Sequence, residues 1–399
     1  MSRLALQANW SYPTSIRVGP GRANELPAAC HSLAMQAPLL VTDPALAKLP
    51  MIGKALQDCR HANLSVSLFC QIKANPSGEN VMDGVNAYHA GKHDGIIAFG
   101  GGSAIDAAKA IALMVGQTRP LWDFEDLGDN WSRVNVAAMA PIVALPTTAG
   151  TGSEVGRASV ICDTKQQLKK IIFHPRMLPS IVILDPELTL ELPPSLTAAT
   201  GMDALSHSLE AYCAPHYHPL AEGIALESIR LVKEYLPRAV HQGNNLEART
   251  QMLVASTMGA TAFQRGLGAM HALAHPLGAI YDAHHGRLNA VLMPYVLQAN
   301  RVAIEQKICR LAAYLQLKNN FTSFLNWILE LRQNLGIEHS LKELGIDEHH
   351  IDRVAKMATE DAASFGNPIR FNELQYRDIL RAAINGQLNE SLKVNEEVC

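Results

Sequence analysis

The stretch GIIAFGGGSAIDAAKAIALMV, residues 95–115, joins a short apolar run, three consecutive glycines and an apolar helical pattern. A strand over 95–99 that turns through glycines into a helix is half of a βαβ unit. Further short apolar runs lie on either side of it, at 37–43, 65–70, 141–146 and 180–185. Strands that alternate with helices at this spacing predict an α/β domain with a mostly parallel sheet.

The pattern changes after about residue 190. Segments such as SLTAATGMDALSHSLEAYCA and EARTQMLVASTMGATAF place apolar residues at helical spacing, and this continues to RDILRAAINGQ. We therefore expect an all-α C-terminal domain, with 186–195 as the connection. The domain prediction is an α/β domain over 1–188 and a helical domain over 189–399.

Composition excludes several classes of protein. The 399 residues include 34 Lys and Arg and 37 Asp and Glu, a net charge of −3 with a pI near 6.6. This balance argues against a basic nucleic-acid-binding face and against a polybasic membrane anchor. We find no signal-peptide pattern and no apolar run long enough to span a bilayer, and the seven cysteines form no C-x-x-C pair. We expect a cytoplasmic protein without nucleic-acid or membrane partners.

Two loops follow predicted strands and suit contact with a nucleotide. Gly100, Gly101, Gly102 and Ser103 open a helix, where backbone N–H groups and the helix dipole can hold a phosphate. The loop PTTAGTGSE, residues 146–154, is rich in hydroxyl groups and lacks bulky apolar side chains. Taken alone, the glycine loop is equally compatible with an ordinary turn, and the second loop is more simply a surface loop.

Asp43 ends the apolar run 37–43 and allows two interpretations. Its carboxylate could accept hydrogen bonds from an adenosine ribose and repel a 2′-phosphate. It could equally cap the helix that follows Pro44, and on the residues alone the cap is favoured.

The histidines form the most informative pattern. Asp203 and His207 are four residues apart in a helical run, His271 and His275 repeat this spacing, and His285 follows. Buried unpaired imidazoles are costly, so a metal ion or a hydrogen-bond network must satisfy them. Oxygen and imidazole ligands without thiolate suit Fe(II), Zn(II), Co(II) or Mn(II). A single such histidine would more simply be a satisfied core residue, but two spaced pairs favour a metal.

Four motifs in order resemble the iron-dependent (group III) alcohol dehydrogenases: GGGSAIDAAK, PTTAGTGSEV, ATGMDALSHSLEAY and HALAHPLGAIYDAHHGRLNAVLMPYV. The similarity extends from about residue 12 to residue 382. It implies a Rossmann-like dinucleotide-binding α/β domain, a helical C-terminal domain with the dehydroquinate synthase-like architecture, and an active site in the cleft between them. It also implies interconversion of a primary alcohol or small diol with its aldehyde, with NAD and Fe(II), or Zn(II), as cofactors, in a homodimer or larger homo-oligomer.

The resemblance carries site residues over by motif position. The implied metal ligands are Asp203, His207, His271 and His285, and His275 is the implied catalytic residue, which would move a proton near the nicotinamide. Asp43 becomes the residue that selects NAD over NADP. The implied cofactor-binding residues are Asp43, Asn75, Gly100, Gly101, Gly102, Ser103, Thr147, Thr148, Lys169, Leu188, Thr189 and Leu192.

Departures from the family pattern concern substrate identity. His284, Gly156 and Ala158 stand where relatives carry other residues. Among alternatives, a dehydroquinate-synthase-like lyase would need a basic cluster for a phosphate-bearing substrate, and only Arg265 and Arg287 lie near the metal motifs. A maleylacetate-type reductase resembles the family without its full metal set. A non-enzymatic metal- or nucleotide-binding scaffold would not need both cofactor loops and intact ligands.

Overall fold

The structure is a computed structural model that describes residues 12, 14–166 and 168–388. The chain divides into two compact units, Tyr12–Leu192 and a second that begins at Pro193. The boundary between the units follows Leu192, within the predicted connection 186–195. It lies four residues after the predicted domain boundary at residue 188. Each unit is described by itself.

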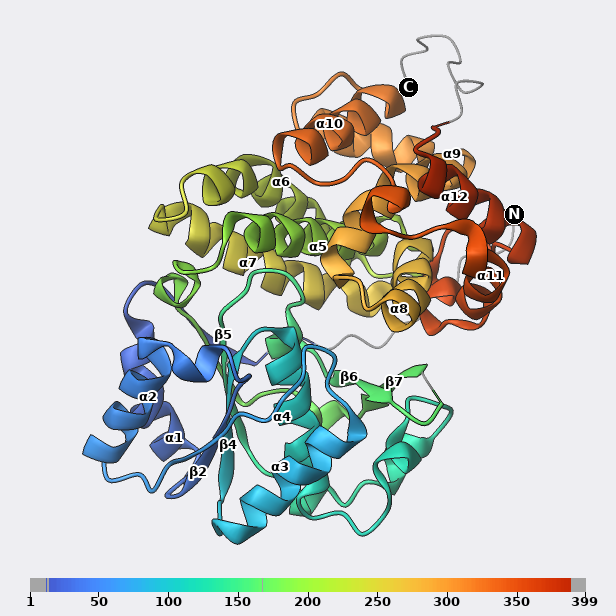
Figure 1. The fold of residues 1–399 in the computed structure, drawn as a ribbon. Coiled ribbons are helices and arrows are strands. Elements are labelled where there is room, and N and C mark those ends of the chain that lie inside the picture. Colours follow the sequence, from blue (N-terminus) through green and yellow to red (C-terminus); the bar gives the residue numbers. More distant parts are fainter. Residues whose placement is uncertain (1–11, 13, 167, 389–399) are drawn as a thin grey trace. The chain divides into compact units, whose positions relative to one another are not determined.

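The first unit is built on a six-stranded sheet in which every paired strand is parallel (Figure 1). The strand order is β1-β8-β5-β4-β2-β3. The strands are β1 (Ser15–Val18), β2 (Pro38–Val41), β3 (Ser67–Phe69), β4 (Gly95–Gly100), β5 (Ile142–Pro146) and β8 (Ile181–Leu184).

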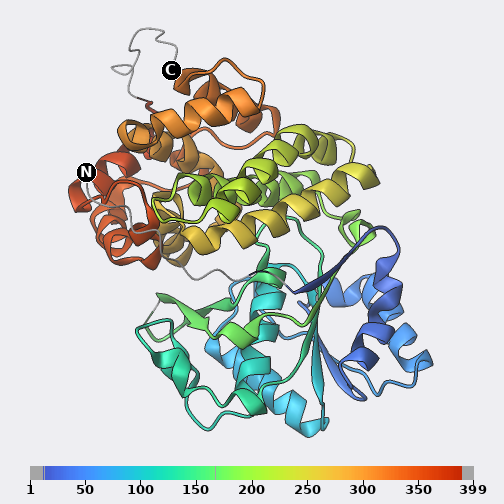
Figure 2. The same cartoon turned by 180° about the vertical axis from the view of Figure 1, so that it is seen from behind.

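Helices cover both faces of this sheet (Figures 1 and 2). On one face lie α1 (Leu26–Ser32) and α2 (Pro50–His61), and on the other lie α3 (Gly78–Ala90) and α4 (Gly102–Met114). Because β4 has a helical layer on each side, all six of its residues are buried. This is why the sequence reads as a continuous apolar run rather than an alternating one.

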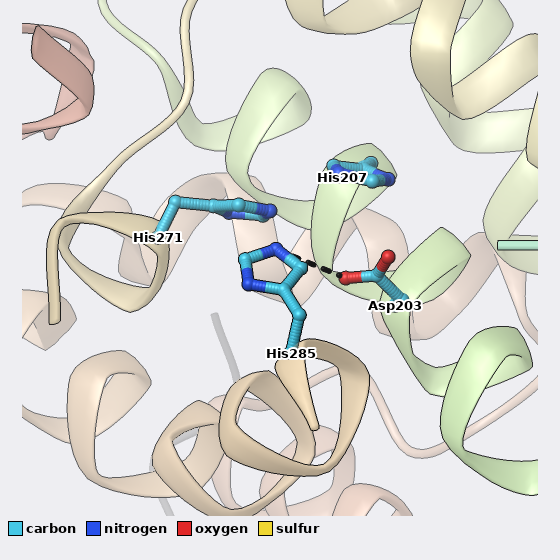
Figure 3. Close-up of side chains that lie close together, drawn as sticks. All are labelled: Asp203, His207, His271 and His285. Carbon is cyan, nitrogen blue, oxygen red and sulfur yellow. Dashed lines mark ion pairs between the residues drawn. The ribbon is translucent and has the colours of Figure 1, made fainter. Parts of the chain in front are cut away.

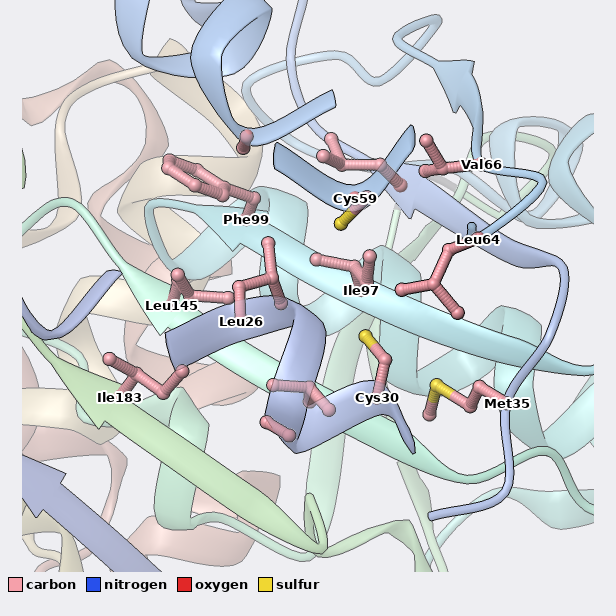
Figure 4. Packing of buried hydrophobic residues seen from close by; sticks show 14 of the residues in the cluster. Leu26, Cys30, Met35, Cys59, Leu64, Val66, Ile97, Phe99, Leu145 and Ile183 are labelled. Atoms are coloured by element: carbon pink, nitrogen blue, oxygen red, sulfur yellow. The ribbon is translucent and has the colours of Figure 1, made fainter. Parts of the chain in front are cut away.

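The core under α1 and α2 shows how the apolar pattern is used (Figure 4). Leu26 and Cys30 of α1 and Cys59 of α2 pack against Ile97 and Phe99 of β4, and all five are almost fully buried. Ile97 and Phe99 are two residues apart, so they point to the same face of the sheet.

The five predicted strands are confirmed, four with shorter bounds and β4 one residue longer, and three strands were missed. One is the edge strand β1, which has two exposed and two half-buried residues and pairs solely with β8. The other two form the antiparallel hairpin of β6 (Ala158–Asp163) and β7 (Leu168–Phe173), a separate two-stranded sheet. Short, partly exposed strands carry little apolar signal, since most of their stability comes from partners distant in sequence.

In the part that the structure describes, the second unit contains helices and no strand, as predicted. Its longest helices are α5 (Pro194–Cys213), α6 (Pro219–His241), α7 (Leu246–Ala262) and α9 (His285–Tyr314). The shorter ones are α8 (Ala269–Tyr281), α10 (Phe321–Asn334), α11 (Ile351–Glu360) and α12 (Glu373–Asn385). Helix α5 is buried along most of its length because α6, α7 and α9 surround it. Among the described helices, none has the length and apolarity needed to cross a bilayer.

Candidate functional site

Four side chains from three helices converge in the second unit (Figure 3). Asp203 and His207 project from one face of α5, His271 comes from the first turn of α8, and His285 is the first residue of α9. One potential ligand atom from each residue lies within 4.8 Å of all the others. The structure thus brings together the four residues that the sequence singled out as metal ligands.

The electrostatics of this cluster suit a cation. Asp203, His207 and His271 are buried, whereas the His285 side chain keeps 29% of its surface exposed. Burial alone would raise the pKa of Asp203, but the neighbouring histidines outweigh it and lower the pKa to about 2. Burial, reinforced by His207, lowers the pKa of His271 well below its usual value. At neutral pH the carboxylate is therefore ionised and the His271 imidazole is neutral, the forms in which both bind metals.

Asn289 lies one turn after His285 on α9, and its side-chain amide shows that the cluster has more hydrogen-bond acceptors than donors. Its Nδ2 lies 2.9 Å from Asp203 Oδ1, 3.2 Å from His271 Nε2 and 3.1 Å from His285 Nε2. With both histidine Nε2 atoms unprotonated, as metal ligation requires, three acceptors meet one amide nitrogen that carries only two hydrogens. Acceptors that converge in excess of donors are what a divalent cation requires, and the residues fit such an ion.

A carboxylate behind His271 holds that ring in place. Glu210, on α5, accepts a hydrogen bond of 2.7 Å from His271 Nδ1 and further bonds from the backbone N–H groups of Gly268 and Met270. Burial raises the pKa of Glu210 to about 7, although the backbone donors oppose this shift. Glu210 was not among the residues predicted from the sequence, although its position three residues after His207 on the same helix face was a usable signal.

His275 lies beside the cluster rather than in it. Its ring stacks on that of His285 with centroids 5.6 Å apart, and its Nδ1 lies 2.8 Å from Asp361 Oδ2. The carboxylate makes Nδ1 the protonated nitrogen of the neutral ring and leaves Nε2 as the acceptor. Asp361 was not foreseen, because it is 86 residues away in sequence.

In the first unit, the two predicted cofactor loops lie side by side. Gly100 and Pro146 are register partners at the ends of β4 and β5, and the Thr147 N–H donates to the Gly100 carbonyl at 3.0 Å. Connections from β2 to β3 and from β4 to β5 run in opposite directions across the sheet. Asp43 and the glycine loop follow the two strands at this switch point, where open α/β sheets bind nucleotides.

Hydrogen bonds connect three other predicted cofactor residues, or their neighbours, near the carboxyl ends of the parallel strands. The Ser103 hydroxyl donates to the carbonyl of Ala74, next to Asn75. Lys169 lies on β7 opposite Cys162 of β6, and the Cys162 N–H donates to the Pro76 carbonyl at 2.8 Å. The hairpin that carries Lys169 is therefore attached to the segment that carries Asn75.

The structure answers the question left open at Asp43. Its Oδ1 accepts hydrogen bonds from the N–H groups of Ala45 at 2.9 Å and Leu46 at 3.0 Å, so it does cap the turn after β2. Within the described residues, Oδ2 makes no hydrogen bond. One oxygen acts as the cap while the other remains available to a ribose.

The side chains that follow β8 make contacts within the first unit. The Leu188 side chain belongs to the core under α1 and α2, and the Thr189 hydroxyl donates to the Pro186 carbonyl at 2.8 Å. The Leu188 side chain is therefore engaged inside the unit, and the Thr189 hydroxyl has already used its hydrogen. Leu192 follows, with its N–H donating to the Thr189 carbonyl at 3.2 Å.

A buried lysine that sequence reasoning missed anchors the loop 146–154. Lys109 of α4 is fully buried, donates to the carbonyls of Ser153 and Ala158, and pairs with Asp106 at 3.3 Å. Asp106 in turn accepts from the Ser153 hydroxyl and from the Val160 N–H. The i,i+3 pair D-A-A-K within an apolar helix could have signalled this role.

The two arginines weighed for a phosphate-binding cluster are both paired. Arg265 is buried, forms a 2.7 Å ion pair with Glu222 and donates to the carbonyls of Tyr212 and His216. The Arg287 guanidinium pairs with Glu338. Neither guanidinium is therefore an uncompensated charge, which disfavours the lyase alternative.

Comparison with protein families and known proteins gives a consistent result. A family described as iron-containing alcohol dehydrogenase matches residues 13–186, and the C-terminal region of the Fe-containing alcohol dehydrogenase family matches residues 197–384. The 4-hydroxybutyrate dehydrogenase of Cupriavidus necator is 35% identical over 383 residues, which cover 94% of this chain and 99% of that protein.

Solved structures with a similar fold are also oxidoreductases by name. The crystal structure of a 1,3-propanediol oxidoreductase superposes with a TM-score of 0.89 at 35% identity, covering 95% of this chain and 100% of that one. Sulfoacetaldehyde reductase from Bifidobacterium kashiwanohense, solved in complex with NAD+, has a TM-score of 0.85 at 29% identity and covers 94% and 99% of the two chains.

Proposed function

The chain belongs to the iron-containing alcohol dehydrogenase family, and from this premise we propose that it interconverts a primary alcohol, or small diol, and its aldehyde by hydride transfer to or from NAD. The family membership confirms the enzyme class that the sequence predicted, and the parallel α/β unit followed by helices confirms the fold class. The observation that carries the proposal is the convergence of four ligand atoms within 4.8 Å.

We propose that Asp203, His207, His271 and His285 hold one divalent ion, Fe(II) by family and Zn(II) as the alternative. When bound, such an ion acts as a Lewis acid that polarises the substrate oxygen and lowers the pKa of the alcohol. The chain's own contribution is a ligand set of one carboxylate and three imidazoles, which leaves part of the ion's positive charge uncompensated.

We assign the cofactor role to the carboxyl edge of the parallel sheet. The N-terminus of α4 and the glycines before it present backbone N–H groups and a partial positive charge to a pyrophosphate. Asp43 Oδ2 accepts from the adenosine ribose, and its charge disfavours NADP. Asn75, Ser103, Thr147, Thr148, Lys169 and the segment from Leu188 to Leu192 complete the proposed site. In functional terms, we propose that the α/β unit, Tyr12–Leu192, binds the dinucleotide and that the helical unit, which begins at Pro193, carries the metal.

His275 is our candidate for moving the proton. Oxidation of an alcohol releases a hydride from the carbinol carbon and a proton from the hydroxyl group. His275 Nε2 accepts that proton, and the Asp361 carboxylate stabilises the imidazolium that forms. The His275 side chain retains 19% of its surface exposed, so the proton has a route to solvent.

The names of relatives suggest which alcohols to test first. We propose 1,3-propanediol, 4-hydroxybutyrate and simple primary alcohols as probe substrates, with the matching aldehydes for the reverse direction. The protein should be purified anaerobically, stripped of metal, reloaded with Fe(II) or Zn(II), and assayed for production of NADH from NAD.

The expected result is metal-dependent formation of NADH with at least one primary alcohol. His271→Ala should abolish both metal binding and activity. His218→Ala is a matched control, because His218 is also buried in the helical unit but caps α6, and this variant should retain both. Full turnover by the metal-free protein would refute the proposed chemistry, and NAD-dependent turnover without net NADH would favour the lyase.

The proposal also covers the cellular location and the oligomeric state of the protein. We propose a cytoplasmic location, supported by seven scattered cysteines that form no C-x-x-C pair. We also propose a homodimer or larger homo-oligomer. Fractionation and light scattering test these two points, and a membrane-bound or monomeric protein would contradict them.

A further inference from the structure

We propose that Glu210 is a positioning residue of the metal site: it fixes the tautomer and direction of the His271 ring, so that α5 controls three of the four ligands. This inference rests on the proposed metal site. Asp203, His207 and Glu210 follow one another on one face of α5, at spacings of four and three residues. The first two supply ligand atoms directly, and the third acts on a ligand that belongs to α8.

The geometry of Glu210 leaves its carboxylate no freedom. Oε2 accepts from His271 Nδ1 and from the Gly268 N–H, both at 2.7 Å, and Oε1 accepts from the Met270 N–H at 2.7 Å. The side chain is almost fully buried. Three short bonds from three donors, two of them in rigid backbone, hold the carboxylate in a single orientation.

This orientation determines which nitrogen of His271 faces the metal. Both oxygens of Glu210 already accept from backbone N–H groups, which favours the ionised form, and an ionised carboxylate cannot donate. The proton of the neutral ring therefore lies on Nδ1 when Glu210 is ionised. The lone pair then lies on Nε2, the nitrogen that points towards Asp203 and His285. The other tautomer would place a proton where the ion must bind. A carboxylate behind a histidine ligand also increases its basicity.

Glu210 has a second role, and the structure allows the two roles to be separated. The beginning of α8 leaves backbone N–H groups without helical acceptors, and Glu210 satisfies those of Gly268 and Met270. Asn367 satisfies the one between them, since its Oδ1 accepts from the Ala269 N–H at 3.1 Å. Asn367 touches the same helix end but not His271, so it is the matched control for capping.

Gly268 is the point where both caps approach the backbone. A Cβ at this position would lie 2.8 Å from Glu210 Oε1 and 2.8 Å from Asn367 Oδ1. The backbone φ of Gly268 is −147°, which any residue can adopt. The glycine is therefore required for space, and its presence in the sequence reflects the two oxygens packed against it.

The first test uses the wild-type protein and needs no variant. Imidazole 15N chemical shifts of His271 are measured in the metal-free protein and after titration with Zn(II). We expect Nδ1 to carry the proton in both states and the Nε2 signal to move on Zn(II) binding. A proton on Nε2 in the metal-free protein would overturn the inference.

The second test compares Glu210→Gln with Asn367→Ala by competition for Zn(II) and by thermal unfolding. Glu210→Gln should raise the Zn(II) dissociation constant by about 10- to 100-fold, the usual effect of losing such a partner, and should mix the His271 tautomers. Asn367→Ala should lower the melting temperature while leaving the Zn(II) affinity and the tautomer unchanged.

The outcomes separate the inference from the function on which it rests. Equal loss of Zn(II) affinity in both variants would reduce Glu210 to a helix cap, and wild-type affinity in Glu210→Gln would remove it altogether. If the wild-type protein binds neither Zn(II) nor Fe(II), the proposed metal site fails first.

Discussion

The two carboxylate oxygens of Asp43 have different roles, so one substitution can remove the charge that faces the cofactor and still keep the cap. Asp43→Asn keeps an oxygen that can cap Ala45 and Leu46 but removes the negative charge. We expect the ratio of kcat/KM for NADP to that for NAD to rise by about tenfold or more, because a like-charge contact is relieved. Steady-state kinetics with both cofactors measure this ratio.

Asp43→Gly is the companion variant, since it removes both the charge and the cap. It should shift the cofactor ratio similarly and in addition lower the melting temperature. A wild-type preference for NADP would contradict the assignment of Asp43.

The pair of His275 and Asp361 predicts a loss of turnover without a loss of metal. In His275→Ala, kcat for alcohol oxidation should fall by about 100-fold, the usual scale for a general base, with full metal occupancy. Asp361→Asn should show a smaller loss, because its amide can still accept from His275 but no longer stabilises the imidazolium by charge. An unchanged kcat and pH profile in His275→Ala would exclude a proton-transfer role.

Asp361 also contributes to acid stability, which provides an independent measurement. Burial acts to raise the pKa of Asp361, but His275 and the Ala363 N–H act more strongly and lower it overall. A lowered carboxyl pKa stabilises the fold above the unfolded value, near pH 4, and this contribution is lost as the pH falls through the folded value. Unfolding of Asp361→Asn should therefore depend less on pH below about pH 4 than unfolding of the wild type.

At the scale of elements, close packing of α9 against α5 sets the position of His285. A Cβ added to Gly286 would lie 2.2 Å from the Ala199 carbonyl oxygen of α5 and 3.2 Å from Asp203 Cβ. Gly286→Ala should force the two helices apart, cost about 1–3 kcal/mol of stability and weaken Zn(II) binding. Gly223→Ala in α6 is the control, because nothing lies within 4 Å of its new methyl group. The control should gain about 1 kcal/mol and keep its metal affinity.

The attachment of α4 to the loop that follows β5 leads to a second prediction at this scale. Lys109→Met leaves Asp106 without its cation and two carbonyls without their donor, which should cost about 3 kcal/mol and weaken NAD binding. Lys54→Met removes an exposed pair with Asp58 on α2 and should cost less than about 1 kcal/mol, with NAD affinity unchanged. Chemical denaturation and NAD titration test both. Wild-type NAD affinity in Lys109→Met would show that the loop does not depend on this anchor.

At the scale of the whole molecule, the two compact units should respond to different ligands. A metal that binds only the folded state stabilises it by about 2.7 kcal/mol at a free concentration 100 times its dissociation constant. Hydrogen exchange should then show Zn(II) protecting α5, α8 and the start of α9, and NAD protecting residues 100–103 and 146–154. Protection of α5 by NAD alone, with no effect of Zn(II), would contradict the division of roles.

The sequence by itself determined what depends on local pattern. Continuous apolar runs predicted the central strands, and helical spacing after residue 190 predicted the helical unit. Two i,i+4 pairs and one further histidine gave five candidate ligands, because a helix places such pairs on one face wherever it packs, and the resemblance to the alcohol dehydrogenase family selected the four that converge. Edge and hairpin strands were missed, since they hold few buried side chains and depend on partners distant in the chain.

Only the tertiary structure decided the partners of those side chains. Asp361 is 86 residues from His275, and Asn367 is 98 residues from the Ala269 N–H that it caps. Glu210 and Asn289 share helix faces with ligands, and this spacing was the only signal that their local sequence offered; it did not show which groups they contact. A hydrogen bond forms between atoms that packing brings within about 3 Å, and helix packing is the sum of many weak contacts spread over the whole unit. For that reason spacing could predict a set of candidate ligands, whereas the groups that orient them became visible only in the folded chain.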